Sequence, residues 1–179
     1  MMALIVMAMM AGATTKVMAQ ISAAGTTVTG TTAGVRLIVP MVMTQTSALN
    51  FGTINVKAAT GGTCILPSYT TTRSFTGGLV ESNIGTQPTN AAYTVNGTKS
   101  STYTLSLPPS ITVTETSGST TMSITSLRAR FSGASSDATV STLSSAGTDS
   151  FTVAGTLTVP VGQAGGLYTG SFDVSVDYN

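Results

Sequence analysis

The strongest constraint on the fold is a two-residue alternation at the C-terminal end of the sequence. Apolar side chains take every second position there, and hydroxyl or carboxyl side chains take the positions between. The apolar set is Tyr168, Phe172, Val174, Val176 and Tyr178, and the polar set is Ser171, Asp173, Ser175 and Asp177. Successive side chains of a β-strand point to opposite faces, so the pattern predicts a strand with its aromatic and valine side chains inward and both aspartates outward.

Shorter segments of the same kind recur along the chain. Their predicted inward positions are Tyr103, Leu105, Leu107, Ile111, Val113, Met122, Ile124, Leu127, Ala129, Phe131, Phe151, Val153, Leu157 and Val159. Turn signals such as Asn96-Gly97 and Pro108-Pro109 separate them. Short strands between such turns predict an all-β antiparallel sandwich or barrel. The densely apolar run Val35–Met43 is predicted to be a strand buried on both faces, with Pro40 at an edge or a bulge.

The composition agrees with strands and disfavours long helices. Charged residues make up 7% of the chain, whereas 35 Thr and 22 Ser place a small hydroxyl on 57 of its 179 residues. Thr is β-branched and suits a half-exposed pleated surface. The seven basic and six acidic residues form no run of one sign, so nucleic-acid binding has no electrostatic basis.

The first 19 residues are predicted to be a secretory signal peptide. An apolar run, Met2–Ala13, precedes Lys16 and the small-residue site Val17-Met18-Ala19, where cleavage is expected. The run is shorter than the roughly 20 residues that span a bilayer. A buried first helix is the alternative, which the strand-rich remainder disfavours. We therefore expect three parts: residues 1–19 as signal, 20–34 as an N-terminal extension and 35–179 as a β-sandwich, secreted and without a membrane span after cleavage.

Residue chemistry argues against an enzyme. The chain has no His, which removes the usual triads and His-based acid–base catalysis. Asp173 and Asp177 share a predicted face but lie about 13 Å apart at roughly 3.3 Å per residue, farther than paired glycosidase carboxylates. The single cysteine, Cys64, is predicted to be a small apolar residue inside a strand. We expect no catalytic, cofactor or metal site, and calcium at Asp137 or Asp149 is the weak remaining metal hypothesis.

Three blocks of sequence resemble a known family. They are Ile38–Thr44 with Leu49–Ile54, Ala91–Gly97 with Tyr103–Pro108, and Phe151–Val159 with Gly166–Tyr178. In this order they resemble the bacterial domain of unknown function DUF4402, and through it the spore-coat-U-like and archaic chaperone–usher pilins. Archaic pilins usually carry a cysteine pair on the first strand and a later one. Here Met41 and Met43 occupy the first-strand region, which favours DUF4402.

The resemblance implies an immunoglobulin-like antiparallel sandwich lacking its last strand. In such pilins the N-terminal extension of a neighbour fills the open groove, giving a head-to-tail homo-oligomeric fibre. A periplasmic chaperone and an outer-membrane usher are the further partners that it implies. The donor here would be the segment 20–34, and a disordered tail is the alternative. The expected inward residues of that donor are Ala24, Thr26, Val28, Gly30 and Thr32, with Val28 the largest.

Two functions therefore stay open, and both place the chain at the cell surface. The first is a structural subunit of a pilus-like fibre. The second is a monomeric adhesin or binding module of the same fold, which would present exposed aromatic side chains on its loops.

Overall fold

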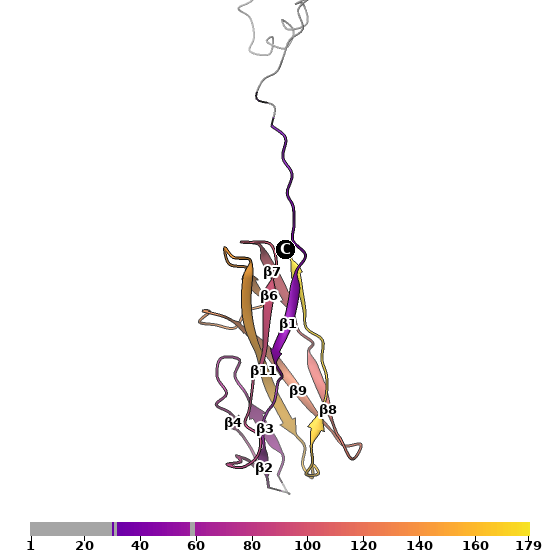
Figure 1. Ribbon diagram of the computed structural model, residues 1–179. Helices are drawn as coiled ribbons and strands as arrows, with labels where there is room; N and C mark the ends of the chain where they lie inside the picture. Colours follow the sequence, from indigo (N-terminus) through magenta and orange to yellow (C-terminus); the bar gives the residue numbers. More distant parts are fainter. Residues whose placement is uncertain (1–29, 31, 58–59) are drawn as a thin grey trace, which may run out of the picture. The chain divides into compact units, whose positions relative to one another are not determined.

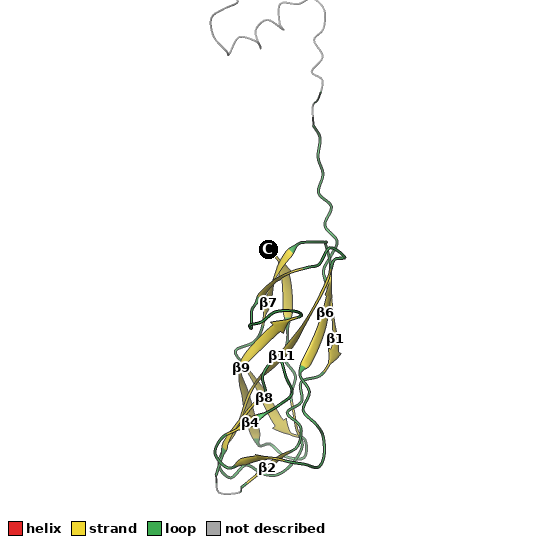
Figure 2. Ribbon diagram, turned by 90° about the vertical axis from the view of Figure 1, so that its left-hand side faces the viewer, coloured by secondary structure: helices red, strands yellow, loops and turns green. Residues whose placement is uncertain are grey.

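The computed structural model describes residues 30, 32–57 and 60–179 (Figure 1). The chain divides into two units, Met1–Leu37 and Ile38–Asn179, and every described strand belongs to the second. The described residues contain no helix, so none of them forms an apolar helix long enough to cross a membrane (Figure 2). The strands are β1 (Val42–Ser47), β2 (Ile54–Val56), β3 (Gly62–Ile65), β4 (Ser74–Phe75), β5 (Leu79–Glu81), β6 (Ala91–Asn96), β7 (Thr102–Ser106), β8 (Ser110–Glu115), β9 (Thr121–Phe131), β10 (Val140–Thr142), β11 (Thr148–Val159), β12 (Tyr168–Thr169) and β13 (Ser175–Tyr178).

These strands form an antiparallel sandwich, which confirms the predicted fold class. The larger sheet has the order β1-β6-β11-β9-β8-β12, and β3 pairs with both β11 and β4. A second sheet has the order β10-β7-β13, and β2 pairs with β5. The long strand β11 pairs with β9 along one side and with β6 and then β3 along the other. It is therefore the central strand around which the larger sheet is built.

Eleven of the fourteen predicted inward positions of the shorter segments are buried, in two clusters along this central strand, and Leu107, Met122 and Leu127 are half-buried. The β8 cluster contains Phe51, Cys64, Leu66, Leu79, Ile111, Val113, Ile124, Ala154, Leu157 and Val159. The β6 cluster contains Ala91, Tyr93, Val95, Tyr103, Leu105, Ala129, Phe131, Leu143, Phe151 and Val153. Aromatic contacts concentrate in the β6 cluster, where the ring of Phe151 stacks on Tyr93 and meets Phe131 edge-on. Most of the apolar alternation in the sequence is thus used to fill these two clusters.

A buried polar contact joins the two sheets within the β6 cluster. The Tyr103 hydroxyl on β7 donates to Asp149 Oδ2 on β11 at 3.0 Å, and Ser141 of β10 donates to the same oxygen at 2.6 Å. Burial, followed by the hydrogen bond to Asp149, raises the pKa of the Tyr103 phenol. The phenol is thus a neutral donor that ties the two sheets together at any ordinary pH.

A β-bulge allows β9 to contribute inward side chains to both buried clusters. Ser126 has a left-handed φ of 52°, and the pairing register between β9 and β11 shifts between Ala154 and Thr156. Before the bulge the inward residues of β9 have even numbers, as Ile124 does, and after it they have odd numbers, as Ala129 does. A bulge adds one residue to one strand and so reverses which face the following residues occupy. Gly155 on β11 lies opposite this bulge.

The structure corrects two sequence predictions about strands. The run Val35–Met43 is not a doubly buried strand: β1 begins only at Val42, and Val35 and Leu37 are exposed. The physical reason is pairing, because the ladder to β6 starts with Val42 and Asn96. The C-terminal alternation is also not one strand. It is divided into β12, which pairs with β8, and β13, which pairs with β7.

Gly155 provides a test of the bulge. A Cβ atom at this position would lie 2.9 Å from the Thr125 carbonyl oxygen and 3.1 Å from Leu127 Cδ2. We expect Gly155→Val to lower the free energy of unfolding by about 1–3 kcal/mol, as overpacking of a core usually does. Urea denaturation measures it, and Gly165→Val is the matched control because no atom lies within 4 Å of a Cβ there. Equal stability of the two variants would contradict this account of the bulge.

Candidate functional site at the open side of the sandwich

The two sheets each end in a strand that lacks a partner on its outer side. β1 pairs only with β6, and β13 pairs only with β7, among the residues that the structure describes. Both strands still direct apolar side chains toward the β6 cluster. We call this region the open side; its side chains are Met41, Met43 and Leu49 at β1, and Phe172, Val174, Val176 and Tyr178 at the C-terminal end.

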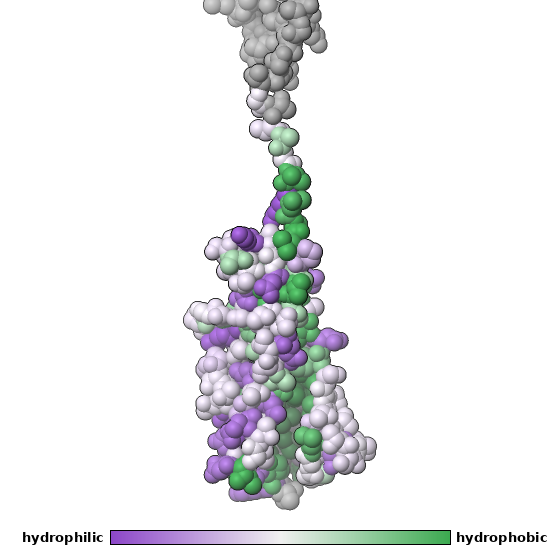
Figure 3. All heavy atoms as spheres, viewed as in Figure 1, coloured by the Kyte–Doolittle hydropathy of each residue, from purple (hydrophilic) through white to green (hydrophobic). Residues whose placement is uncertain are grey.

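Side chains of the open side are covered less well than the rest of the core. All seven are half-buried, whereas their neighbours Val95 on β6 and Tyr103 on β7 are 0% exposed. The alternation of the C-terminal segment is as predicted, with Asp173 and Asp177 exposed between the apolar positions. Apolar atoms form a lengthwise band on the face where Figure 1 draws β1 (Figure 3). These side chains are therefore less well covered than the fully buried residues on the strands beside them.

The backbone of β13 also has unused hydrogen-bonding capacity. The Asn179 amide points toward β7, where it donates to the carbonyl of Thr102 at 3.1 Å. Amides alternate in direction along an antiparallel strand, so those of Val176 and Tyr178 point away from β7. A free row of this kind can pair with another strand. The open side thus offers both apolar surface and main-chain donors.

One end of the open side is held by a small cluster of hydrogen bonds. The Tyr178 hydroxyl donates to the Val39 carbonyl at 2.8 Å and accepts from the Thr98 amide. The Val39 amide donates to the Thr98 hydroxyl at 2.7 Å. Gly97 leaves room for the phenol, because a Cβ atom there would collide with the Tyr178 hydroxyl. The start of the β1 region and the end of β13 are therefore fixed at the same end of the sandwich.

The predicted donor residues stay a prediction. Ala24, Thr26 and Val28 lie outside the described residues. Gly30 and Thr32 are described; both are exposed and belong to no strand. The sequence pattern also did not identify Met41 and Met43 as side chains of an open edge. Edge position depends on which strands pair, and local alternation carries no such signal.

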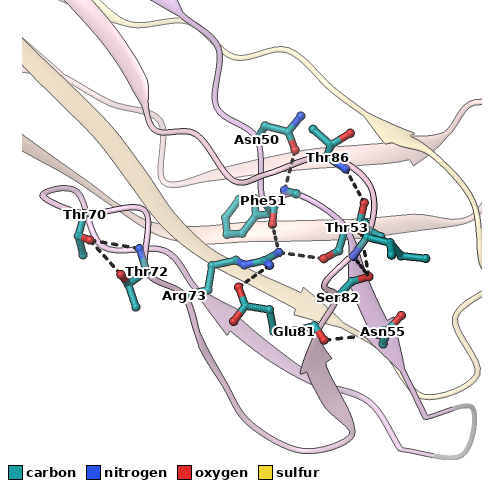
Figure 4. A network of polar contacts seen from close by, with 12 residues as sticks. Asn50, Phe51, Thr53, Asn55, Thr70, Thr72, Arg73, Glu81, Ser82 and Thr86 are labelled. Atoms are coloured by element: carbon teal, nitrogen blue, oxygen red, sulfur yellow. Dashed lines mark hydrogen bonds and ion pairs between the residues drawn. The ribbon is translucent and has the colours of Figure 1, made fainter.

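Arg73 forms the most extensive polar network of the sandwich, and its role is structural (Figure 4). Its side chain is 1% exposed and pairs with Glu81 Oε1 at 2.9 Å. It also donates to the carbonyls of Phe51 at 2.6 Å and Thr53 at 3.0 Å. These bonds fasten the segment before β2 to β5. The guanidinium is buried and bonded to three acceptors, while its Nε atom has no hydrogen-bond partner among the described residues.

The remaining chemical candidates are also occupied by the protein itself. Asp137 accepts hydrogen bonds from Ser68 and from Arg130, and Asp149 accepts from Tyr103 and Ser141. No group of three or more His, Cys, Asp or Glu able to hold a metal occurs in the described part of the chain. Cys64 is 0% exposed and lies in β3, as predicted from the sequence.

Tyr69 is the exception among the aromatic residues. All ten aromatic side chains lie in the described part, and Tyr69 is the one among them that is exposed, at 65%. The Arg130 guanidinium lies 4.5 Å from its ring centre. Asn90 Nδ2 holds the surrounding loop by donating to the carbonyls of Pro67, Ser68 and Thr70. A depression of about 370 Å³ beside the ring is lined mainly by hydroxyl side chains.

The buried position of the Cys64 thiol predicts how it reacts with thiol reagents. Burial raises the pKa of its thiol from 9.0 to about 11. We expect the native protein at pH 8 to react with a thiol reagent only in step with unfolding, because the thiolate is the nucleophile and the site is buried. The raised pKa also makes stability fall as the pH rises from about 9 toward 11, since the unfolded thiol ionises first. Rapid labelling in the absence of denaturant would contradict the buried position.

Most of the chain matches one known protein family. A family model described as "Domain of unknown function (DUF4402)" matches residues 41–178. The comparison with curated proteins finds no match, and neither does the comparison with solved structures. The match begins at Met41, includes every strand from β1 to β13 and ends at Tyr178. The chain therefore belongs to the DUF4402 family.

Proposed function

We propose that the chain is a structural subunit of a bacterial surface fibre, assembled by insertion of a strand from a neighbouring copy into the open side. The observation that carries the proposal is the pair of edge strands, β1 and β13, each without a described partner on its outer side and with inward side chains that are only half-buried. An added strand would cover those side chains, and its carbonyl groups would accept hydrogen bonds from the outward-pointing amides of β13. Each copy would receive one strand and give one.

The geometry of such an exchange explains why a fibre would form. The receiving surface and the donated segment are different parts of the chain, so the contact is head-to-tail. A head-to-tail contact whose rotation does not close generates an open filament. Sheet edges left unpaired promote uncontrolled association. Occupation by a specific strand would direct that tendency into one ordered contact.

The proposal includes a route to the cell surface. Cleavage of the signal peptide after Ala19 would release the chain into the periplasm and leave six basic and six acidic residues, because Lys16 is removed. A protein near zero net charge associates readily. A periplasmic chaperone would cover the open side until an outer-membrane usher passes the subunit to the fibre. In this proposal the subunit carries out no catalysis.

A monomeric adhesin is the second candidate function, and Tyr69 is the observation that favours it. An exposed aromatic ring beside a hydroxyl-lined depression could stack on a sugar ring. The two functions are separable by Tyr69→Ala, which should abolish glycan-array binding by an adhesin and leave fibre assembly unchanged.

The open side can be tested with single substitutions. We expect Val176→Lys to abolish SDS-resistant ladders on unboiled gels and filaments in electron micrographs, because it places a charge where the added strand must pack. Val140→Lys is the matched control, since Val140 is 51% exposed on β10, at the other edge of the same sheet. Far-UV circular dichroism and urea denaturation verify that both variants fold.

A second substitution at the same position tests the main-chain hydrogen bond without introducing a charge. Val176→Pro removes the amide that points away from β7 and leaves the β7 ladder intact. We expect it to lower assembly at least tenfold while the monomer remains folded. Filaments formed normally by both folded Val176 variants would contradict the proposed role of the open side.

A further inference from the structure

We infer that the strand donated to the open side is the segment Ala33–Ile38 of a second copy, and that Val35 and Leu37 are its anchoring side chains. This inference rests on the function proposed above. It places the donor immediately before β1, whereas the sequence pattern assigned it to residues 20–34 with Val28 as anchor. The two assignments share the same receiving surface and differ in the residues that fill it.

The exposure of this segment is the first observation. Val35 is 86% exposed, Leu37 82%, Ile38 59% and Val39 58%. Contiguous large apolar side chains with this exposure usually mark an interaction site. They belong to no described strand, and all four side chains are more than half exposed. The open side has half-buried apolar side chains that an apolar segment of this kind could cover.

The alternation of the segment matches what the open side requires. In an extended conformation Ala33, Val35 and Leu37 share one face. The earlier candidate face, Ala24, Thr26, Val28, Gly30 and Thr32, contains one large apolar residue. Burying a Val or Leu side chain removes much more apolar area from water than burying Ala, Gly or Thr. The segment next to β1 is therefore the better complement to the half-buried row on β13.

Charge gives an independent argument for the same register. With Val35 and Leu37 turned inward, Arg36 faces outward. The outward positions of the C-terminal segment are Asp173 and Asp177, both exposed. Neither aspartate belongs to the two ion pairs found among the described residues. An inserted strand would thus place its only cation beside two free carboxylates, and opposite charges across neighbouring strands are stabilising.

The hydrogen bonds at Val39 set the C-terminal limit of the donor. The Val39 amide and carbonyl are both held within their own sandwich by Thr98 and Tyr178. The donated part must therefore end by Ile38. Six extended residues span about 20 Å at roughly 3.3 Å per residue, enough to run beside all of β13. Successive subunits would then be joined by a very short connection.

Matched substitutions in the mature chain separate the two donor assignments. We expect Val35→Ser combined with Leu37→Ser to abolish SDS-resistant ladders, whereas Val28→Ser leaves them unchanged. Val35 and Leu37 are exposed, so their double variant should unfold at the same urea concentration as the parent chain. The opposite result, loss of ladders with Val28→Ser only, would overturn this inference and leave the proposed function standing. Absence of ladders from the parent chain itself would overturn the proposed function.

Charge reversal and cross-linking test the register. We expect Arg36→Asp to reduce assembly and Asp177→Arg to restore it in the double variant; no restoration would contradict the pairing. We also expect Leu37→Cys with Val176→Cys to give a disulfide-linked ladder under oxidation, whereas Val28→Cys with Val176→Cys does not. Cys64 is buried and should not interfere. A cross-link confined to monomers would show that the segment fills the open side of its own chain, which also overturns the inference.

Discussion

The half-covered open side of the core is the constraint on which the rest of this structure depends. Every sheet of a sandwich has two edges, and an edge strand with inward apolar side chains needs cover from the opposite layer. β6, β7, β9 and β11 obtain that cover, whereas β1 and β13 do not, so Met43 and Val176 remain half-buried. No described strand pairs with the outer side of β1 or of β13.

The frame that presents this side is rigid for identifiable reasons. β11 pairs along nearly its whole length, and the bulge at Ser126 lets its partner β9 contribute to both buried clusters. The Tyr103–Asp149 hydrogen bond fixes the second sheet against the first, and Arg73 fastens the segment before β2. The Arg73 contacts involve residues outside the open side, whereas Tyr103 lies on β7 directly beside Tyr178 of β13. The Tyr103–Asp149 hydrogen bond thus holds the strand on which the open edge β13 is built.

Period-two patterning was sufficient to predict the fold class and most inward residues, because a residue's face on a strand follows from local sequence. The strand Phe151–Val159 and the apolar role of Cys64 are examples. What could not be predicted depends on partners distant in sequence. The run from Val35 is as apolar as a buried strand, yet its residues before Val42 pair with no described strand. The C-terminal alternation is continuous, yet β12 and β13 pair with strands of different sheets. Apolar composition alone does not distinguish a side chain buried within its own chain from one that a neighbour buries.

The central claim is that the open side receives a strand when the protein assembles. Hydrogen exchange at the amides of Val176 and Tyr178 tests it most directly, because both point away from β7 and need a new acceptor to become protected. The account predicts rapid exchange at both amides in the isolated monomer and exchange slowed at least a hundredfold in the assembled form, with the amide of Asn179 protected in both. Equal protection of Val176 and Tyr178 in monomer and assembly would contradict it.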